Sequence, residues 1–551
     1  MRDIFYKNTI GRKSQLLTIS KFLFIPLLFY LLLFFLLSFP LLLNFNTHIF
    51  ADNGDGLQNY WNLWWVNKAV TELHTSAWFT TYLHYPQGVT LIGHTLNIFN
   101  GLVGVLLLKF LTPIQTYNFI VIFSFVIGGF TSFLLSYHLT KGYRGSLLAG
   151  YIYTFSEFHF AHAEGHMQLV SLEWIPLFIL AFHLLLSQPN IIKGIFASIA
   201  LFLVFLCDYY YFFYCVLIGI IIFIFYLYNN RNLISKQFLL SIFTFVLTST
   251  IFCLPTIFRL IYTNINDPLL GAHLDSFFSL NLLSVFIPGG HWRYAYLTNF
   301  FWSQINGNIH ETSVYLGWSV ITTVIFVKLN NRIFNNGYIK LSFFIAFIFF
   351  ILSLGPHINI GRYIFDSIPM PYSILNLIPI FKLSGMPIRM VVIVFLYVGV
   401  IYGVGVEYLL GKGKWYKLVG IVLILFMLIE YLPKPIPVTN LEIPEYVRLI
   451  SKSPGNYGVI DQFSPIGEAL YYQTIYNKPM AFGYISRVPQ SVNDRDNRLT
   501  DLLSRNMYVD IYKQFNLRYF VIPNDVNIKS TCKYTLTDNG NVRFYDIGSC
   551  L

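Results

Sequence analysis

Long apolar runs dominate the first 432 residues of the chain. The sequence is 56% hydrophobic and only 11% charged, about half the charged share of a soluble globular chain. A helix needs about 20 apolar residues to cross a bilayer. We therefore predict an all-α polytopic membrane bundle of about eleven transmembrane helices, near 22–43, 115–140, 145–160, 171–187, 193–208, 210–228, 238–256, 313–328, 341–355, 389–410 and 415–432.

Two of the apolar runs need an interpretation of their own. The run 22–43 follows a basic N-terminus, and no small-residue cleavage site comes after it, so it is interpreted as an uncleaved signal anchor. The run 96–112 would reverse the orientation of every later helix if it crossed the membrane. We therefore expect the first outer loop, 44–114, to hold interfacial helices.

The charges give the expected orientation. With the N-terminus in the cytoplasm, 16 of the 23 Lys and Arg residues before residue 433 fall in cytoplasmic segments, as the positive-inside rule requires. Of the 14 acidic residues in the same region, only Asp3 and Glu407 fall on that side. The outer face is thus expected to hold the polar chemistry. The formal charge of +11 is explained by these anchoring residues, so no nucleic-acid partner is expected.

Composition changes beyond residue 432. The Pro-rich segment LPKPIPVTN leads into residues 433–551, where Lys and Arg (13) nearly balance Asp and Glu (11) and no apolar run is long enough to span. YGVIDQ and RYFVIP are typical of buried strands, IGEALYYQTIY and 497–515 of helices, and YTLTDNGNVRFYDIG of a hairpin. We predict two domains, a transmembrane domain at 1–432 and a small extracytoplasmic α/β domain at 433–551.

Two carboxylates, Asp52 and Asp55, follow the first apolar run in FADNGDGLQNYWNLWW. Ionisable groups at a bilayer are costly and often functional. An alternative is an Asx-type turn in which Asp55 caps a helix starting near Leu57. The aromatic residues that follow form either an interfacial belt or a sugar-stacking platform, and the belt is favoured; they are Tyr60, Trp61, Trp64 and Trp65.

A second polar cluster lies in EFHFAHAEGHMQLVSLEW. His159, His162 and His166 are spaced by three and four residues, which places them on one face of a helix. Imidazole mixed with carboxylate suits Mn, Zn or no metal better than Mg or Ca alone. We expect either a divalent metal, Mn or Mg, or no cofactor. The metal-ligand candidates, for which hydrogen bonding at a loop is the alternative, are Glu157, His162, Glu164 and His166.

Several motifs resemble the GT-C superfamily of polyprenyl-phosphate-dependent glycosyltransferases. One basic N-terminal span, an outer loop opening with an acidic GD motif, a multi-span bundle and an outer C-terminal domain give the general likeness. GDGLQNYWNLWW, HYPQGVTLIGHT, YTFSEFHFAHAEGHMQLVSLEWIPL, CDYYYFFY and KLSGMPIRM resemble a bacterial branch of that superfamily. The likeness covers the whole membrane part and implies a GT-C-like fold.

The resemblance also implies an activity. GT-C enzymes take a sugar from an isoprenoid phosphate at the outer membrane face, and an acid in the first outer loop is catalytic or binds metal. Asp55 matches that position, with Asp52 as the second catalytic candidate. A carboxylate can take the proton of the attacking acceptor hydroxyl. Neither outer loop has the D-x-D of the metal-dependent oligosaccharyltransferases, since Asp52 and Asp55 are spaced D-x-x-D.

The departing phosphate needs a positive charge or a metal. Arg293, Arg362 and Arg389 are the expected phosphate-binding residues, and Arg259 and Lys382 share their side of the membrane. Asp208 and Glu311 are further candidates, each being either a site acid or a helix-end group. Cys532 and Cys550 flank the C-terminal hairpin and form either a disulfide or two free thiols.

We therefore predict transfer of a sugar from a polyprenyl-phosphate donor to a glycan, lipid or protein acceptor at the plasma membrane, as in cell-envelope glycan or glycoconjugate synthesis. A transporter or flippase is one alternative, because intramembrane acids, a Pro-rich segment and a polar cavity would suit it too. The acids lie at helix ends more than mid-membrane and no internal repeat is visible in the sequence. A non-catalytic assembly factor for lipid-linked glycans is the other alternative.

Overall fold

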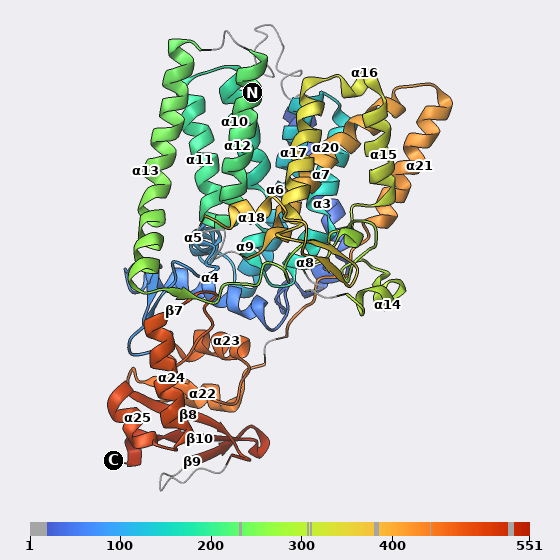
Figure 1. Cartoon of the computed structure of the whole chain (residues 1–551). Coiled ribbons are helices and arrows are strands. Elements are labelled where there is room, and N and C mark those ends of the chain that lie inside the picture. The colour runs from blue at the N-terminus through green and yellow to red at the C-terminus, as the bar shows by residue number, and fades with distance from the viewer. Residues whose placement is uncertain are drawn as a thin grey trace.

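The computed structural model describes residues 19–230, 234–305, 308, 311–378, 385–440, 442–526 and 534–550. Each of the eleven apolar runs falls on a helix, which confirms the polytopic bundle (Figure 1). Among the described residues, six helical segments are long and apolar enough to cross a membrane. The eleven helices are α3 (Ile25–Leu37), α6 (Pro113–Thr140), α7 (Tyr143–Thr154), α10 (Trp174–Ser187), α11 (Ile191–Cys207), α12 (Tyr209–Asn229), α13 (Lys236–Asn266), α15 (Trp318–Leu329), α17 (Gly337–Ser353), α20 (Val391–Leu410) and α21 (Lys414–Glu430).

Several helix boundaries differ from the sequence prediction, the largest difference being in α13, which ends at Asn266 instead of residue 256. The first helix ends at Leu37 instead of residue 43, because the residue before Pro40 is driven out of the α region. The run expected at 145–160 breaks after Thr154, and a separate short helix, α8 (Glu157–Ala163), follows. The run 96–112 forms α5 (Ile98–Leu107), which rises only about 15 Å. That length is too short to span, as the interfacial interpretation requires.

The centre of the bundle is built from α6, α7 and α20. Gly145 and Gly403 let α7 and α20 cross closely, because a Cβ at either glycine would lie within 2.2 Å of the carbonyl oxygen of the other. By contrast, α13 and α21 expose most of their apolar side chains, among them Phe243 and Phe426. This distribution is that of inner helices surrounded by lipid-facing ones.

Short elements gather at the end of the bundle nearest the C-terminal region. Helix α4 (Asp55–Thr71) lies across this end, beside α5, α8 and α9 (Met167–Val170) (Figure 1). The strand pairs β1 (Phe79–Thr80) with β2 (Val89–Thr90) and β4 (Ile358–Ile360) with β5 (Tyr363–Phe365) are antiparallel. The remaining short helices are α14 (Asn299–Trp302) and α18 (Tyr372–Leu375), while α16 (Asn331–Phe334) lies at the opposite end.

The C-terminal region folds around a four-stranded sheet of order β6-β8-β10-β9. β6 (Gly458–Asp461) is parallel to β8 (Leu517–Pro523), and β10 (Val542–Asp546) pairs antiparallel with β8 and with β9 (Tyr534–Thr537). The predicted strands, hairpin and helix α23 (Ile466–Tyr476) are confirmed. The single helix predicted at 497–515 is wrong, since α24 (Gln490–Ser504) and α25 (Tyr508–Phe515) are separated by Asn506, whose φ is +58°. Helix α22 (Glu445–Lys452) precedes the sheet.

Many contacts attach this region to the membrane part, and two of them serve as examples. The Trp61 indole donates to Gln473 Oε1 (2.7 Å), which joins α4 to α23. β3 (Leu269–Leu270), which follows α13, pairs with β7 (Val488–Pro489). The second contact brings the segment just before β7 against the membrane part. Cys532 and the side chain of Cys550 lie outside the described residues.

Candidate functional site

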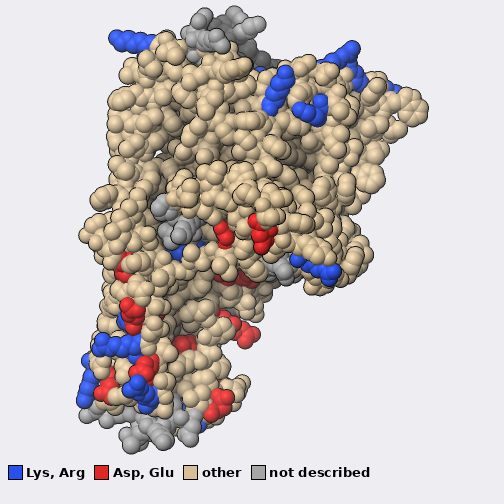
Figure 2. Space-filling model, viewed as in Figure 1, with Lys and Arg blue, Asp and Glu red and all other residues tan. Residues whose placement is uncertain are grey.

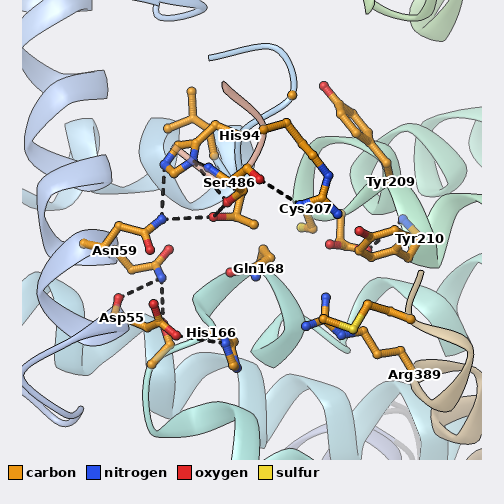
Figure 3. A pocket seen from close by; sticks show the side chains of 18 of the residues that line it. Asp55, Asn59, His94, His166, Gln168, Cys207, Tyr209, Tyr210, Arg389 and Ser486 are labelled. Atoms are coloured by element: carbon orange, nitrogen blue, oxygen red, sulfur yellow. Dashed lines mark hydrogen bonds and ion pairs between the residues drawn. The ribbon is translucent and has the colours of Figure 1, made fainter. Parts of the chain in front are cut away.

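A cavity of about 400 Å³ lies between the lower end of the bundle and the C-terminal region. Its walls come from α4, the loop at 93–96, the turn between α8 and α9, the start of α12, the turn that leads into α20, and residues 484–487. In Figure 3, Asp55 and His166 lie on the opposite side of the cavity from Arg389 and Tyr210. Parts of the sequence that are far apart thus meet around one space.

The structure brings the two acidic motifs together. The Asp52 backbone N–H donates to Glu164 O (2.6 Å), and the Asn59 amide donates to Gly165 O (2.6 Å). Gly165 permits this approach, because a Cβ at that position would lie 2.8 Å from Asp55 Cβ. The first outer loop is therefore held directly against the turn between α8 and α9.

Asp52 and Asp55 have different roles at the start of α4. Asp52 Oδ1 accepts from the backbone N–H groups of Gly54 and Gly56 (2.9 Å each), so Asp52 supplies the Asx-type contact that was considered for Asp55. Burial raises the pKa of Asp52. Asp55 is the first residue of α4 and its carboxylate contacts His166 Nε2 (3.1 Å), which lowers its pKa. The Asp55 side chain is 42% exposed, so a molecule in the cavity can reach it.

His162 and His166 extend the contacts of Asp55 into the protein. The two Nδ1 atoms are 3.1 Å apart, and His162 Nε2 lies 3.6 Å from Glu311 Oε2. One ligand atom from each of His162, His166 and Glu311 lies within 4.8 Å of the others. These three residues form a possible metal-binding cluster, in which Glu311 completes the set rather than Glu157 or Glu164.

Glu311 also forms a buried ion pair with Arg389. Arg389 Nη2 lies 2.5 Å from Glu311 Oε1, and Arg389 Nε is 3.2 and 3.3 Å from the two carboxylate oxygens. The two side chains are 3% and 6% exposed. Burial raises the pKa of Glu311, but the charge of Arg389 outweighs it and lowers that pKa to about 2. The guanidinium also lies 5.5 Å from the Tyr210 ring.

The remaining predicted metal ligands and acids are placed differently. Glu157 accepts from the N–H groups of Gly289 and His291 (3.1 Å each) and faces away from the cavity. Glu164 lines the cavity and contacts His291 Nε2 (3.2 Å). Asp208 lines it as well, while its Oδ1 caps α12 by accepting from two backbone N–H groups. Both interpretations of Asp208 therefore hold at once.

His159 and most of the predicted cations lie elsewhere. His159 is interior, with its ring nitrogens facing the carbonyl oxygens of Thr154 and Val170, so the three histidines do not share a site. Arg293 donates to the carbonyl oxygens of Leu37 and Pro433, and Arg362 is exposed beside β5. Arg259 is exposed on α13, and Lys382 lies outside the described residues. Of the expected cations, Arg389 is the one that lines the cavity.

The aromatic residues of α4 have a structural role. Trp61 stacks on Trp65 with ring centroids 6.0 Å apart, and both side chains are 1% exposed. The Trp61 indole is bonded to Gln473. Neither tryptophan lies at a lipid interface or in the cavity, so the interfacial-belt interpretation is wrong for these two residues.

The sequence analysis did not predict that neutral polar residues from the first outer loop and the C-terminal region form one wall of the cavity. His94 Nδ1 accepts from the Ser486 backbone N–H (3.2 Å), and His94 Nε2 lies 3.2 Å from Asn62 Oδ1. Burial lowers the pKa of His94 to about 3. Gln58 donates to Thr95 Oγ1 (3.0 Å) beside it, and Gln168 lines the cavity. His94 stands in one of the motifs that carry the family resemblance, but the partner segment at 486 is 392 residues away.

Comparisons with known proteins agree with this fold. Residues 27–430 match a family described as a domain of unknown function, DUF6311. No curated protein matches the chain. Among solved structures, an oligosaccharyltransferase from Archaeoglobus fulgidus in the apo form is similar with a TM-score of 0.51 at 12% identity, over 91% of this chain and 69% of that one. The arabinofuranosyltransferase AftD from mycobacteria is similar with a TM-score of 0.59 at 10% identity, over 96% of this chain and 41% of that one.

Both solved structures are GT-C glycosyltransferases, so the expected GT-C-like fold is confirmed. At these identities the similarity concerns the fold alone. The chain is a multi-pass membrane protein that belongs to the DUF6311 family and has the fold of the GT-C glycosyltransferases.

Proposed function

We propose that this protein transfers a sugar from a polyprenyl-phosphate donor to an acceptor hydroxyl at the outer face of the plasma membrane. The observation that carries the proposal is the place of Asp55 on a GT-C fold. Its carboxylate is accessible from the cavity, is held by His166, and faces Arg389 across the cavity (Figure 3). This arrangement suits a general base opposite a cation.

The reaction follows from these groups. The acceptor hydroxyl oxygen attacks the anomeric carbon of the sugar while Asp55 takes the hydroxyl proton. The bond between the anomeric carbon and the phosphate oxygen breaks, and the electron pair leaves with the polyprenyl phosphate. Arg389 adds positive charge where the phosphate departs, although Nε and Nη2 of its guanidinium already bind Glu311. A hydrogen bond from His166 keeps Asp55 ionised and oriented for the proton transfer.

The residues around Glu311 fit a divalent cation. If the His166 Nε2–H donates to Asp55, the lone pair of His166 Nδ1 is the one that could bind an ion, and an ion there would replace the contact between His166 Nδ1 and His162 Nδ1. With its proton on Nδ1, His162 has the lone pair of Nε2 directed at Glu311. That nitrogen is buried and has no hydrogen-bond partner among the described residues. His162, His166 and Glu311 would hold Mn²⁺ or a similar ion. Such an ion supplies Lewis-acid stabilisation of the leaving phosphate.

The charge of the cavity supports the same assignment. Five carboxylates and two guanidinium groups are found among its described lining residues; the carboxylates are Asp52, Asp55, Glu164, Asp208 and Glu311, and the cations are Arg389 and Arg487. A phosphate entering a cavity with this excess of negative charge meets repulsion. One divalent cation would offset most of it.

We also propose the orientation that the charges favour. In Figure 2, Lys and Arg are seen at the bundle end away from the C-terminal region, whereas Asp and Glu are seen in the lower half of the molecule, where other Lys and Arg residues accompany them. The positive-inside rule then puts the N-terminus in the cytoplasm. The cavity and the domain at 433–551 lie outside, where an envelope glycan, lipid or protein acceptor is available. Residues 1–432 form the transmembrane domain.

The test is transfer by the purified protein in lipid nanodiscs. Undecaprenyl-phosphate monosaccharides with a radiolabelled sugar are offered together with envelope lipid and glycan acceptors. Asp55→Asn keeps the size of the side chain but loses its basicity, so turnover should fall by about 10²- to 10⁴-fold. Asp52→Asn should be milder, since Asp52 accepts two backbone hydrogen bonds that an amide oxygen can also accept.

Asp366→Asn is the matched control, because Asp366 is an exposed carboxylate outside the cavity. Its turnover should equal that of the wild type. Wild-type protein that moves the lipid across the bilayer without forming a glycosylated product would support a flippase instead. An Asp55→Asn variant with unchanged turnover would remove Asp55 from the role of base.

A further inference from the structure

One wall of the cavity consists of neutral polar groups joined by hydrogen bonds, and the cation Arg487 follows it next to Ser486. His94 joins two elements of it: its Nδ1 accepts from the Ser486 N–H, so its Nε2 carries the proton and faces Asn62 Oδ1. Gln58 donates to Thr95, whose hydroxyl is 3.2 Å from Ser486 Oγ. The first outer loop and the C-terminal region are therefore locked together at this wall.

Gln168 lies between this wall and the acids. It belongs to the short helix α9, is 2% exposed, and lines the cavity. Figure 3 shows it at the centre of the space, with Asp55 and Asn59 on one side and Tyr210 and Arg389 on the other. Its Oε1 is buried and has no hydrogen-bond partner among the described residues. A buried amide oxygen in this state favours a ligand or water that donates a hydrogen bond.

The hydrogen-bonding groups of the wall and of Gln168 indicate which kind of ligand they would bind. Amide and hydroxyl side chains pair with hydroxyls, each of which both donates and accepts. At neutral pH a phosphate is largely deprotonated, so it cannot donate a hydrogen bond to the Gln168 oxygen and would leave that oxygen unsatisfied. Apolar lipid chains would leave it unsatisfied as well. A sugar ring carries several hydroxyls at fixed angles and satisfies both the oxygen of Gln168 and the wall.

We propose that Gln168 accepts a hydrogen bond from a hydroxyl of the transferred sugar, and that His94 positions Ser486 to complete this sugar-reading subsite. The inference rests on the proposed function, whose donor subsite it describes. Gln168 is then a specificity-determining residue and His94 a positioning residue. The C-terminal region takes part in choosing the sugar, since Ser486 belongs to it.

Lipid binding tests the subsite separately from catalysis. Affinities of the purified full chain are measured by native mass spectrometry for bare undecaprenyl phosphate and for undecaprenyl phosphate carrying glucose, galactose, mannose or N-acetylglucosamine. Gln168→Leu keeps the volume of the side chain without its polar atoms, and Gln168→Ala removes both. Gln462→Ala is the control, because Gln462 is exposed outside the cavity.

We expect the wild type to bind at least one sugar-bearing lipid more tightly than the bare lipid. Both Gln168 variants should lose about 3- to 10-fold of that preference and bind the bare lipid as the wild type does, and Gln462→Ala should change nothing. A preference retained in both variants overturns the inference, and so does a loss of affinity that is equal for bare and sugar-bearing lipids. Equal wild-type affinity for all five lipids would mean that only water satisfies Gln168. Wild-type protein that binds no lipid would overturn the proposed function itself.

Discussion

Replacing Glu311 by Leu should leave the Arg389 charge buried without its partner. The pair is almost fully enclosed, with side chains 3% and 6% exposed and a shortest N–O distance of 2.5 Å. Burial raises the pKa of Glu311, but Arg389, together with His162 and His166, lowers it to about 2, so the ionised carboxylate is favoured. Breaking a buried pair by removing one partner costs about 3–5 kcal/mol.

The assay is thermal unfolding of the purified protein in detergent with a chelator present, so that no metal contributes. Glu311→Leu and Arg389→Met should each lower the unfolding midpoint by about 3–4 °C, because the unfolding entropy of a 551-residue chain is about 1.2 kcal/mol/K. The double variant should recover most of the loss, because replacing both charges by apolar groups removes the desolvation cost of each. The double-mutant cycle should therefore give a coupling of about 3 kcal/mol.

A second ion pair of the chain serves as the control. Arg144 contacts Glu407 at 2.9 Å, but the Arg144 side chain is 56% exposed. Arg144→Met should cost less than about 1 kcal/mol, since solvent screens such a pair. Additive effects of the Glu311 and Arg389 replacements, or single variants as mild as Arg144→Met, would refute the reasoning.

Two further predictions concern the metal and the orientation. Chelation should abolish turnover and added Mn²⁺ should restore it, and calorimetry should find one Mn²⁺ bound per chain, lost in His166→Ala and weakened by acid because protons compete for imidazole. Chelator-resistant turnover without Mn²⁺ binding would remove the metal. With an impermeant thiol reagent applied to cells from outside, Asn53→Cys and Gln462→Cys should be labelled and Asn230→Cys should not. Labelling at Asn230 would contradict the proposed orientation.

The helices of the membrane part could be predicted from the sequence, because a bilayer requires long apolar segments that satisfy their own backbone hydrogen bonds. The apolar runs predict helices, because a helix satisfies its own backbone inside lipid and these continuous runs lack the alternation of barrel strands. The strands of the C-terminal sheet were equally clear from alternating patterns and turn residues. The errors came where one residue interrupts a continuous pattern, as Asn506 does between α24 and α25. A left-handed residue of this kind does not disturb hydrophobic periodicity, so the pattern predicted one helix.

Only part of the candidate site could be predicted from the sequence, for a related reason. His162 and His166 are four residues apart in one short motif, and the predicted topology put Asp55 on the same face of the membrane. Glu311 and Arg389 are 78 residues apart, and each had been considered separately, as a helix-end charge and as a phosphate ligand. Nothing local to either residue indicates that they pair. The tertiary fold decides this, because it buries both side chains in the same wall.

The position of Arg389 changes how its role at the phosphate must be understood. Two of its guanidinium nitrogens already bind Glu311, so the carboxylate neutralises part of the Arg389 charge before a sugar donor binds. The same bonds orient Glu311 toward His162, whose Nε2 lies 3.6 Å away. Lysine offers a point charge and cannot bind a carboxylate through two nitrogens at once. In the proposed reaction, Arg389 would thus act on the phosphate in two ways, through its own remaining charge and through the geometry it imposes on Glu311, and only an arginine would supply both.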